Sequence, residues 1–147
     1  MTDSGKPTRI HEVGAVFVPV SDQERALAFY IDKLGFEKRA DFTYGAEGLR
    51  WVEVAPPGAG NTIALVPPGE GESPGGDEAR CAFATEDIEA DHASLAAGGV
   101  EVDPEIAREG GRRAGLVSTE AGVSDPVPAQ FFFRDSEGNR FLIVQPG

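Results

Sequence analysis

The chain has 147 residues, which suits one domain or two small modules that share a core. Its formal net charge is −12, from 25 acidic and 13 basic residues, which argues against binding to nucleic acids or anionic membrane surfaces. No apolar run approaches the roughly 20 residues of a membrane span, and residues 1–9 lack the apolar core of a secretion signal, so we expect a cytoplasmic protein. Cys81 is the only cysteine, and its apolar surroundings predict a buried, unreactive thiol.

The first predicted elements are a strand and an amphipathic helix. Residues 14–20 alternate as a strand does, and Pro19 predicts a sheet edge or a locally unpaired position. Ser21 and Glu24 match a capping box, in which each side chain binds a free backbone N–H group of the other residue. Gly35 is expected to stop the helix. The buried stripe should comprise Leu27, Tyr30, Ile31 and Leu34.

Three more strands complete a first β-α-β-β-β module over residues 10–67. They are predicted at residues 36–44, 49–55 and 62–66. Residues 68–79 are rich in Pro, Gly and acidic side chains, so we expect a linker there.

The pattern restarts in a second module over residues 80–147. A strand is predicted at residues 80–85, and Asp87 is a helix cap. Gly98 and Gly99 end that helix before a strand that opens at Val100.

Two similar hairpins close the modules. Residues 131–133 and 141–144 flank Asp135-Ser-Glu-Gly-Asn139, and residues 51–55 and 62–66 flank a turn that also ends in Gly-Asn. The second module is longer, and its extra residues fall in the Gly- and Pro-rich stretch 107–128. This stretch is either a mobile loop over a binding site or a tolerated surface insertion, and both interpretations are open.

The repeat predicts an α+β fold in which two tandem βαβββ modules form one compact domain. Each sheet has one face under its helix and one uncovered face. Two such sheets can form an open barrel-like sheet, with the helices outside and the uncovered faces lining a cleft. The paired modules belong either to one chain or to two chains of a homodimer.

Several motifs resemble the vicinal oxygen chelate superfamily, which includes glyoxalases, bleomycin resistance proteins and extradiol dioxygenases. The resemblance rests on Val20-Ser-Asp22, Ala28-Phe-Tyr30 and Leu34-Gly-Phe36 around the first helix. Phe132-Phe-Arg-Asp-Ser-Glu-Gly-Asn139 is similar to the superfamily's Phe-Arg-Asp-Pro-x-Gly-Asn hairpin, with Ser136 in place of the usual proline. The similarity covers about residues 12–146 and is closest in type to metal-free bleomycin-resistance-like members.

The resemblance implies a divalent metal held by His and Glu from the first and last strand of each module. Counted from the helix caps and the hairpin asparagines, the four ligand positions hold Ala15, Ala64, Arg80 and Leu142. None of these binds a divalent cation in the usual way. His11 precedes the first strand and His92 lies on the second helix, so the two histidines are not placed to share an ion. We therefore expect no metal and no cofactor.

Strand alternation predicts a mostly apolar, aromatic cleft that suits an organic molecule. One or two of the three phenylalanine rings at residues 131–133 should face it, and Phe42 and Tyr44 are placed at its rim. The candidate ligand-binding residues are Phe17, Trp51, Glu53, Arg80, Phe131, Phe133 and Leu142.

Three of these candidates have alternative roles. Arg80 and Glu53 either neutralise each other, which we favour because a buried unpaired charge is costly, or Arg80 binds a carboxylate or phosphate of the ligand. Trp51 either stacks on the ligand or packs in the core or a dimer interface.

Together these features predict a metal-independent, homodimeric small-molecule binding protein of the glyoxalase/bleomycin resistance type. A cationic ligand would suit its acidic charge. The alternatives are a glyoxalase-, lyase- or dioxygenase-like enzyme with a metal at a non-standard site, a cofactor-free isomerase that uses Glu53 or Arg80 as acid or base, and a regulatory or scaffold protein.

Overall fold

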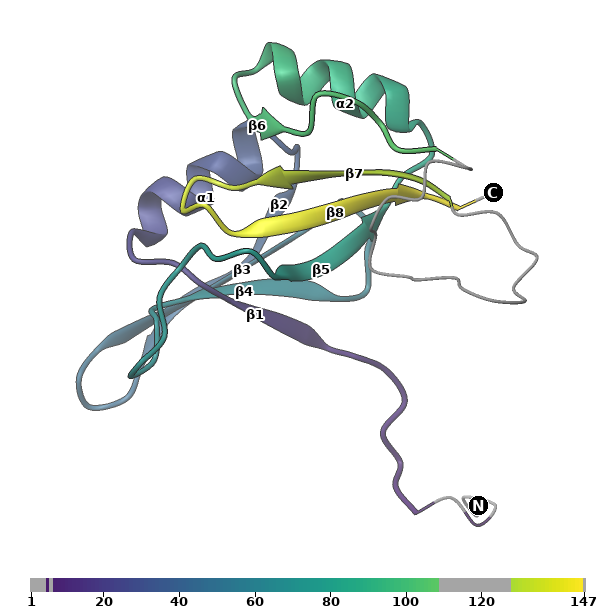
Figure 1. Ribbon diagram of the computed structural model, residues 1–147. Coiled ribbons are helices and arrows are strands. Elements are labelled where there is room, and N and C mark those ends of the chain that lie inside the picture. The colour runs from purple at the N-terminus through teal and green to yellow at the C-terminus, as the bar shows by residue number, and fades with distance from the viewer. Residues whose placement is uncertain (1–4, 6, 109–127, 147) are drawn as a thin grey trace.

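Two β-α-β-β-β units follow one another in the computed structural model, which describes residues 5, 7–108 and 128–146 (Figure 1). The first unit comprises β1 (Ala15–Pro19), α1 (Gln23–Asp32), β2 (Glu37–Tyr44), β3 (Leu49–Ala55) and β4 (Thr62–Val66). The second comprises β5 (Ala79–Ala84), α2 (Ile88–Ala97), β6 (Glu101–Val102), β7 (Ala129–Arg134) and β8 (Arg140–Gln145). Most of the predicted insertion lies outside the described residues, and the limits of the two modules and the linker stay predictions.

The strands form two four-stranded mixed sheets rather than a closed barrel. The strand orders are β1-β4-β3-β2 and β5-β8-β7-β6. In each sheet the first strand of the unit pairs in parallel with the last, and the other neighbours are antiparallel. The predicted α+β fold of two βαβββ modules is therefore confirmed, and β1 lies at a sheet edge, as Pro19 indicated.

The N-terminus of α1 differs from the predicted capping box. Asp22 is the N-cap, and its carboxylate accepts a hydrogen bond from the backbone N–H of Arg25 at 3.0 Å. The Ser21 hydroxyl instead donates to Glu137 at 2.9 Å. Glu24 turns away to form an ion pair on the first sheet. The prediction was wrong because a carboxylate from the distant second hairpin binds the serine.

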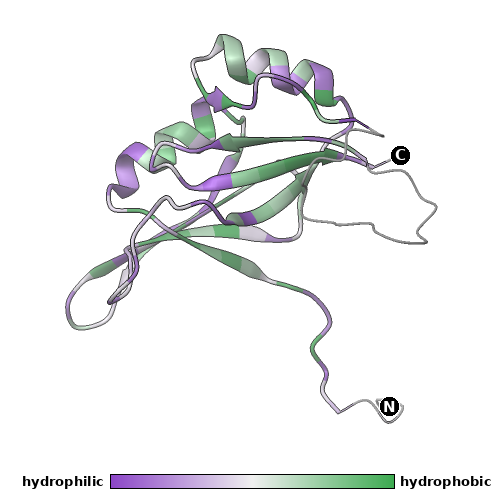
Figure 2. Cartoon of the chain, viewed as in Figure 1, coloured by the Kyte–Doolittle hydropathy of each residue, from purple (hydrophilic) through white to green (hydrophobic). Residues whose placement is uncertain are grey.

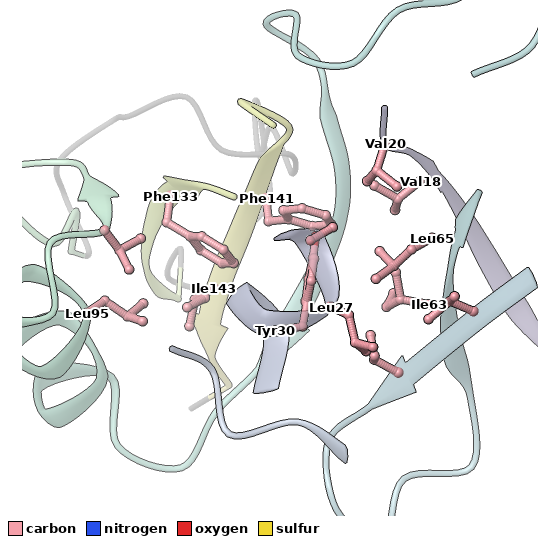
Figure 3. Close-up of a cluster of buried hydrophobic side chains, with 14 of the residues drawn as sticks. Val18, Val20, Leu27, Tyr30, Ile63, Leu65, Leu95, Phe133, Phe141 and Ile143 are labelled. Atoms are coloured by element: carbon pink, nitrogen blue, oxygen red, sulfur yellow. The ribbon is translucent and has the colours of Figure 1, made fainter. Parts of the chain in front are cut away.

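One hydrophobic core is shared by both modules. Leu27 and Tyr30 of α1 lie in its centre, between residues of the first sheet and residues of the second (Figure 3). Ile31 was predicted to be buried, but it is 38% exposed, and Ala26 is buried instead. The core residues on the helix-facing sides of the sheets are Val18, Val20, Val52, Val54, Ile63, Leu65, Phe131, Phe133, Phe141 and Ile143.

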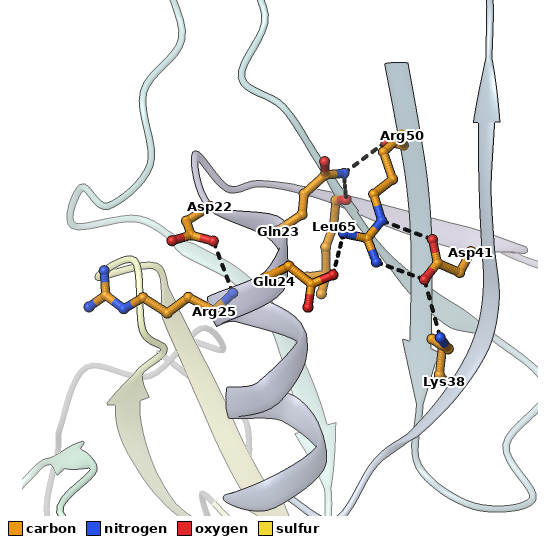
Figure 4. Close-up of polar contacts among 8 residues, drawn as sticks. All are labelled: Asp22, Gln23, Glu24, Arg25, Lys38, Asp41, Arg50 and Leu65. Carbon is orange, nitrogen blue, oxygen red and sulfur yellow. Dashed lines mark hydrogen bonds and ion pairs between the residues drawn. The ribbon is translucent and has the colours of Figure 1, made fainter. Parts of the chain in front are cut away.

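A polar cluster fastens the start of α1 to the first sheet (Figure 4). Arg50 donates to both carboxylate oxygens of Asp41, at 2.9 and 2.8 Å, and to Glu24 at 2.6 Å. Lys38 also binds Asp41, and the hydrogen bonds from these two cations hold the pKa of Asp41 well below its usual range. Gln23 donates from its amide to the backbone carbonyl of Arg50 at 2.8 Å.

A buried polar network joins the two modules, and we call it the inter-module latch. The Tyr30 hydroxyl donates to Asp135 at 2.6 Å. The Asn139 amide donates to the carbonyl of Pro19 at 2.9 Å and accepts from the backbone N–H of Gly75 at 2.8 Å. Helix α1, strand β1 and the linker are therefore all tied to the β7–β8 hairpin.

The histidine of α2 has a structural environment. Asp87 caps this helix, as predicted, by accepting from the N–H of Ala90 at 3.0 Å. The His92 Nε2 atom lies 2.7 Å from the carbonyl oxygen of Asp103, and its ring packs edge-on against Phe131. These contacts place His92 on the side of the second sheet that faces α2.

Candidate functional site

Four aromatic side chains cluster on the side of the first sheet that is turned away from α1. They are Phe17 on β1, Phe42 and Tyr44 on β2, and Trp51 on β3, and we call them the aromatic face. Phe17, Phe42 and Tyr44 are 64%, 51% and 39% exposed. Strand β1 is hydrophobic over most of its length although it lies at the sheet edge (Figure 2). An exposed apolar surface of this kind is typical of a binding site.

Trp51 is at the centre of the aromatic face. Phe42 lies directly opposite it on β2, and the two rings are nearly parallel, with centroids 6.4 Å apart. Phe17 and Tyr44 meet the indole edge-on, at 5.6 and 5.9 Å. Cross-strand and edge-to-face contacts of this kind favour a defined ring position. Trp51 on β3 therefore contacts rings on both of its sides, from β1 and from β2.

Glu53 lies beside this indole on the same strand. The Trp51 Nε1–H group donates to Glu53 Oε2 at 2.6 Å. Opposite Glu53 the sheet carries only the methyl groups of Ala40 and Ala64. Within residues 7–108 and 128–146, Glu53 forms no ion pair. The site thus combines a stacking surface with one carboxylate.

The predicted ion pair between Arg80 and Glu53 is not present in the chain, so our favoured interpretation of these charges was wrong. The Arg80 guanidinium donates to the carbonyl oxygens of Gly75 at 2.9 Å and Ser73 at 3.5 Å. Its Nε atom is buried without a hydrogen-bond partner among the described residues. Arg80 therefore holds the linker against β5 and does not reach the aromatic face.

Phe131 and Phe133 lie in the core, each 1% exposed. Phe131 contacts His92, and the Phe133 ring stacks on Phe141 with centroids 5.4 Å apart. Because side chains alternate along a strand, Phe132 takes the opposite side, where the Arg140 guanidinium lies 3.6 Å from its ring centroid. This corrects the predicted orientation of Phe131 and Phe133.

Of the seven candidate residues, the structure brings together Phe17, Trp51 and Glu53. Leu142 is 2% exposed and lies on the second sheet, opposite Phe132. The contact of Arg140 with Phe132 was not predicted from the sequence. Their diagonal positions across the β7–β8 hairpin are the signal that could have revealed it.

The positions that correspond to metal ligands do not fit a divalent cation. Ala15 and Ala64 have no donor atom, Leu142 is an alkyl side chain, and Arg80 is a cation. Across the described ranges, no group of three or more His, Cys, Asp or Glu side chains is placed to hold a metal ion. Burial raises the pKa of the Cys81 thiol to about 11, so this thiol is a poor nucleophile and a poor ligand at neutral pH.

A separate cavity of about 490 Å³ lies at the edge of β7. Its lining comes from residues 103–108, from β7 and from Arg140, and it shares no residue with the aromatic face.

In the part of the chain that the structure describes, no helix is long and apolar enough to cross a membrane.

Comparison with known families decides where this fold belongs. The family profile described as the glyoxalase/bleomycin resistance protein/dioxygenase superfamily matches residues 9–143. The chain belongs to this superfamily. The vicinal oxygen chelate resemblance of the helix and hairpin motifs is thereby confirmed.

Relatives within the superfamily include an antibiotic-binding protein. The crystal structure of TnmS3, described as an antibiotic binding protein from Streptomyces sp. CB03234, is 34% identical, with a TM-score of 0.71 over 95% of this chain and 99% of that one. A superfamily member from Sphaerobacter thermophilus DSM 20745 is 29% identical, with a TM-score of 0.71 over 95% and 100% of the two chains. The protein YetH of Bacillus subtilis (strain 168) is 35% identical over 92 residues, 63% of this chain and 76% of YetH.

Proposed function

We propose that this superfamily member is a metal-independent protein that binds a small organic molecule on its aromatic face. The observation that carries the proposal is the set of exposed rings around Trp51, with the Glu53 carboxylate beside them. Aromatic side chains with a few polar groups suit organic ligands where they line a cleft. The similarity to TnmS3, which is described as binding an antibiotic, supports the same class of function.

We further propose that two copies form a homodimer and that the ligand lies between them. Both sheets turn their helix-facing sides into one core, so a single chain leaves the aromatic face uncovered. The second sheet also has a side that is turned away from its helix. On that side, β5 exposes the small residues Ala82 and Ala84. A second copy can lay that sheet over the aromatic face and leave a cleft. Ile10 and Val13, just before β1, are further exposed apolar side chains that a second copy could cover.

The mass in solution tests the dimer. A 15.5 kDa chain that forms a dimer should show twice this mass in size-exclusion chromatography with light scattering. A single-chain mass at the concentrations at which ligand binds would contradict the two-chain cleft and leave only the open face.

Ligand binding can be followed by intrinsic fluorescence, because Trp51 is the only tryptophan. We expect flat acridine and naphthalene compounds to quench its emission, and the compounds to be recovered unchanged. Dialysis against EDTA should leave the affinity the same. Phe42→Ala should weaken binding, whereas Ile31→Ala, which removes an exposed apolar side chain on α1, should not.

Two results would overturn the proposal. One is the absence of binding by every compound of this class. The other is binding that EDTA abolishes and an added divalent metal restores. Conversion of a bound compound to a product would favour the alternative of an enzyme.

A further inference from the structure

We propose that Glu53 makes the aromatic face selective for aromatic cations, meaning flat rings that carry a protonated nitrogen. This inference rests on the proposed function and names the ligand class of the same site. It assigns Glu53 two tasks, one for each carboxylate oxygen.

The first task is to position Trp51. Glu53 Oε2 accepts the hydrogen bond from the indole Nε1–H at 2.6 Å, so the indole is oriented by a polar contact as well as by its ring neighbours. An indole nitrogen that is partly buried usually needs such an acceptor. The stacking surface is therefore preorganised before a ligand arrives.

The second task is to receive a positive charge. In the described part of the chain, Oε1 of Glu53 has no hydrogen-bond donor, and no Lys, Arg or His forms an ion pair with this carboxylate. The cation predicted to neutralise it, Arg80, is held by the linker carbonyls. A half-buried carboxylate with a single neutral donor is incompletely compensated. A charged N–H group of a ligand would supply the missing partner.

The surroundings leave room for that group. The residue opposite Glu53 on β2 is the small, partly exposed Ala40, which leaves the carboxylate open on that side, whereas Ala64 on β4 is fully buried. Phe17 lies across Ala64 from Glu53, and its exposed ring stands nearly perpendicular to the indole of Trp51, so the carboxylate lies near two aromatic rings. Aromatic faces attract ammonium groups, most strongly where water is partly excluded.

Long-range electrostatics act in the same direction. The net charge of −12 raises the local concentration of cations near the protein. This attraction is not specific to one site, so it predicts faster and slightly tighter binding of any cation. The Glu53 contact predicts a preference that one substitution removes.

The test uses three probes with one ring system and different charges: 1-naphthylmethylammonium, 1-naphthylmethanol and 1-naphthylacetate. Binding to the full-length protein is measured by isothermal titration calorimetry. We expect the cation to bind about tenfold more tightly than the alcohol, which corresponds to one charge-assisted hydrogen bond, and the anion to bind most weakly.

Glu53→Gln keeps an oxygen acceptor for Trp51 and removes the charge. We expect this variant to bind the alcohol as the wild type does and to lose the preference for the cation. Glu47→Gln removes one charge from the exposed turn between β2 and β3 and is the matched control. It should keep the preference.

Each other outcome has a defined meaning. Equal binding of cation and alcohol to the wild-type protein, a comparison that needs no variant, refutes the selectivity and leaves the proposed function intact. Equal losses in Glu53→Gln and Glu47→Gln assign the preference to overall charge and overturn the role of Glu53. Absence of binding by all three probes counts against the proposed function itself, and the inference fails with it.

Discussion

The two hairpins share a sequence pattern but differ in what they hold together. The β3–β4 turn ends in Asn61, whose exposed amide donates at 2.6 Å to the carbonyl of Val13 in its own module. The β7–β8 turn ends in Asn139, which is fully buried and donates to Pro19 of the other module. One asparagine closes a module, whereas the other fastens two modules.

The residues before these asparagines explain the difference. The first turn reads Pro57-Gly-Ala-Gly-Asn61, and the second reads Asp135-Ser-Glu-Gly-Asn139. Asp135 accepts a hydrogen bond from the Tyr30 hydroxyl, and Glu137 accepts one from the Ser21 hydroxyl. Both donors belong to the first module. Pro57 and Ala59 occupy the corresponding positions of the first turn and have no side-chain acceptor. Two side chains, Asp135 and Glu137, therefore allow the second turn, but not the first, to bind the other module through hydrogen bonds.

The largest effect on stability is expected from substitution of the two asparagines, because Asn139 is buried and Asn61 is exposed. Asn139→Ala removes the partners of Pro19 and Gly75 in a buried setting, so we expect a loss of about 3 kcal/mol in the free energy of unfolding. Asn61→Ala removes one exposed contact and should cost less than about 1 kcal/mol. Urea unfolding followed by circular dichroism measures both. Equal losses would show that the two asparagines do the same work.

The next effect concerns Tyr30 and its dependence on pH. Burial, followed by the nearby Asp135 carboxylate, raises the pKa of Tyr30 well above its usual value. Tyr30→Phe should cost about 1–2 kcal/mol at pH 7, because Asp135 loses a donor.

Above pH 10 this difference should shrink. The unfolded tyrosine ionises near pH 10 while the folded one stays protonated, so the unfolded state binds fewer protons and the wild type loses stability as pH rises. The limiting slope is about 1.4 kcal/mol per pH unit. Tyr44, the other tyrosine, is present in both proteins and cancels in the comparison. A difference that stays constant from pH 8 to pH 11 would contradict a buried, protonated Tyr30.

The fold was predictable because its determinants are local. Strands β3 and β4 begin and end at the predicted residues, since alternating apolar residues and Gly-rich turns lie within a few positions of each other. The cap of α1 was not predictable in this way. Glu137 takes the Ser21 hydroxyl across a separation of 116 residues, which no local pattern contains.

The candidate site was predictable only where residue types differ along a strand. Trp51 and Glu53 alternate with Val52 and Val54, so their side of the sheet could be assigned. Residues 131–133 are all phenylalanine, and three identical residues carry no record of which side faces the core. The position of Arg80 could not be predicted for a second reason. Backbone carbonyl groups of the irregular linker bind its guanidinium, and the sequence of side chains does not indicate where those carbonyl groups lie.

The smallest effect on stability is expected from substitution of Glu137, in the turn between β7 and β8. Glu137 accepts from the Ser21 hydroxyl at 2.9 Å and from the Asp22 N–H at 3.0 Å. Partial burial acts to raise its pKa, but these hydrogen bonds outweigh it, and the pKa of Glu137 is lowered from 4.5. Glu137→Gln should therefore cost about 0.5–1 kcal/mol at pH 7, a modest value because the group is solvent-accessible.

The pH dependence distinguishes this contact from a general effect of charge. A carboxyl group with a lowered folded pKa stabilises the protein above the unfolded pKa, near 4.5, and this contribution is lost as pH falls through the lower folded value. The wild type and Glu137→Gln should thus converge in thermal stability as pH falls below 4.5 and through the folded pKa. Glu47→Gln, at an exposed turn, should match the wild type throughout the same titration. If the stability difference between the wild type and Glu137→Gln did not shrink below pH 4.5, the serine contact would depend on the shape of the side chain, and the link between the hairpin and α1 would not be electrostatic.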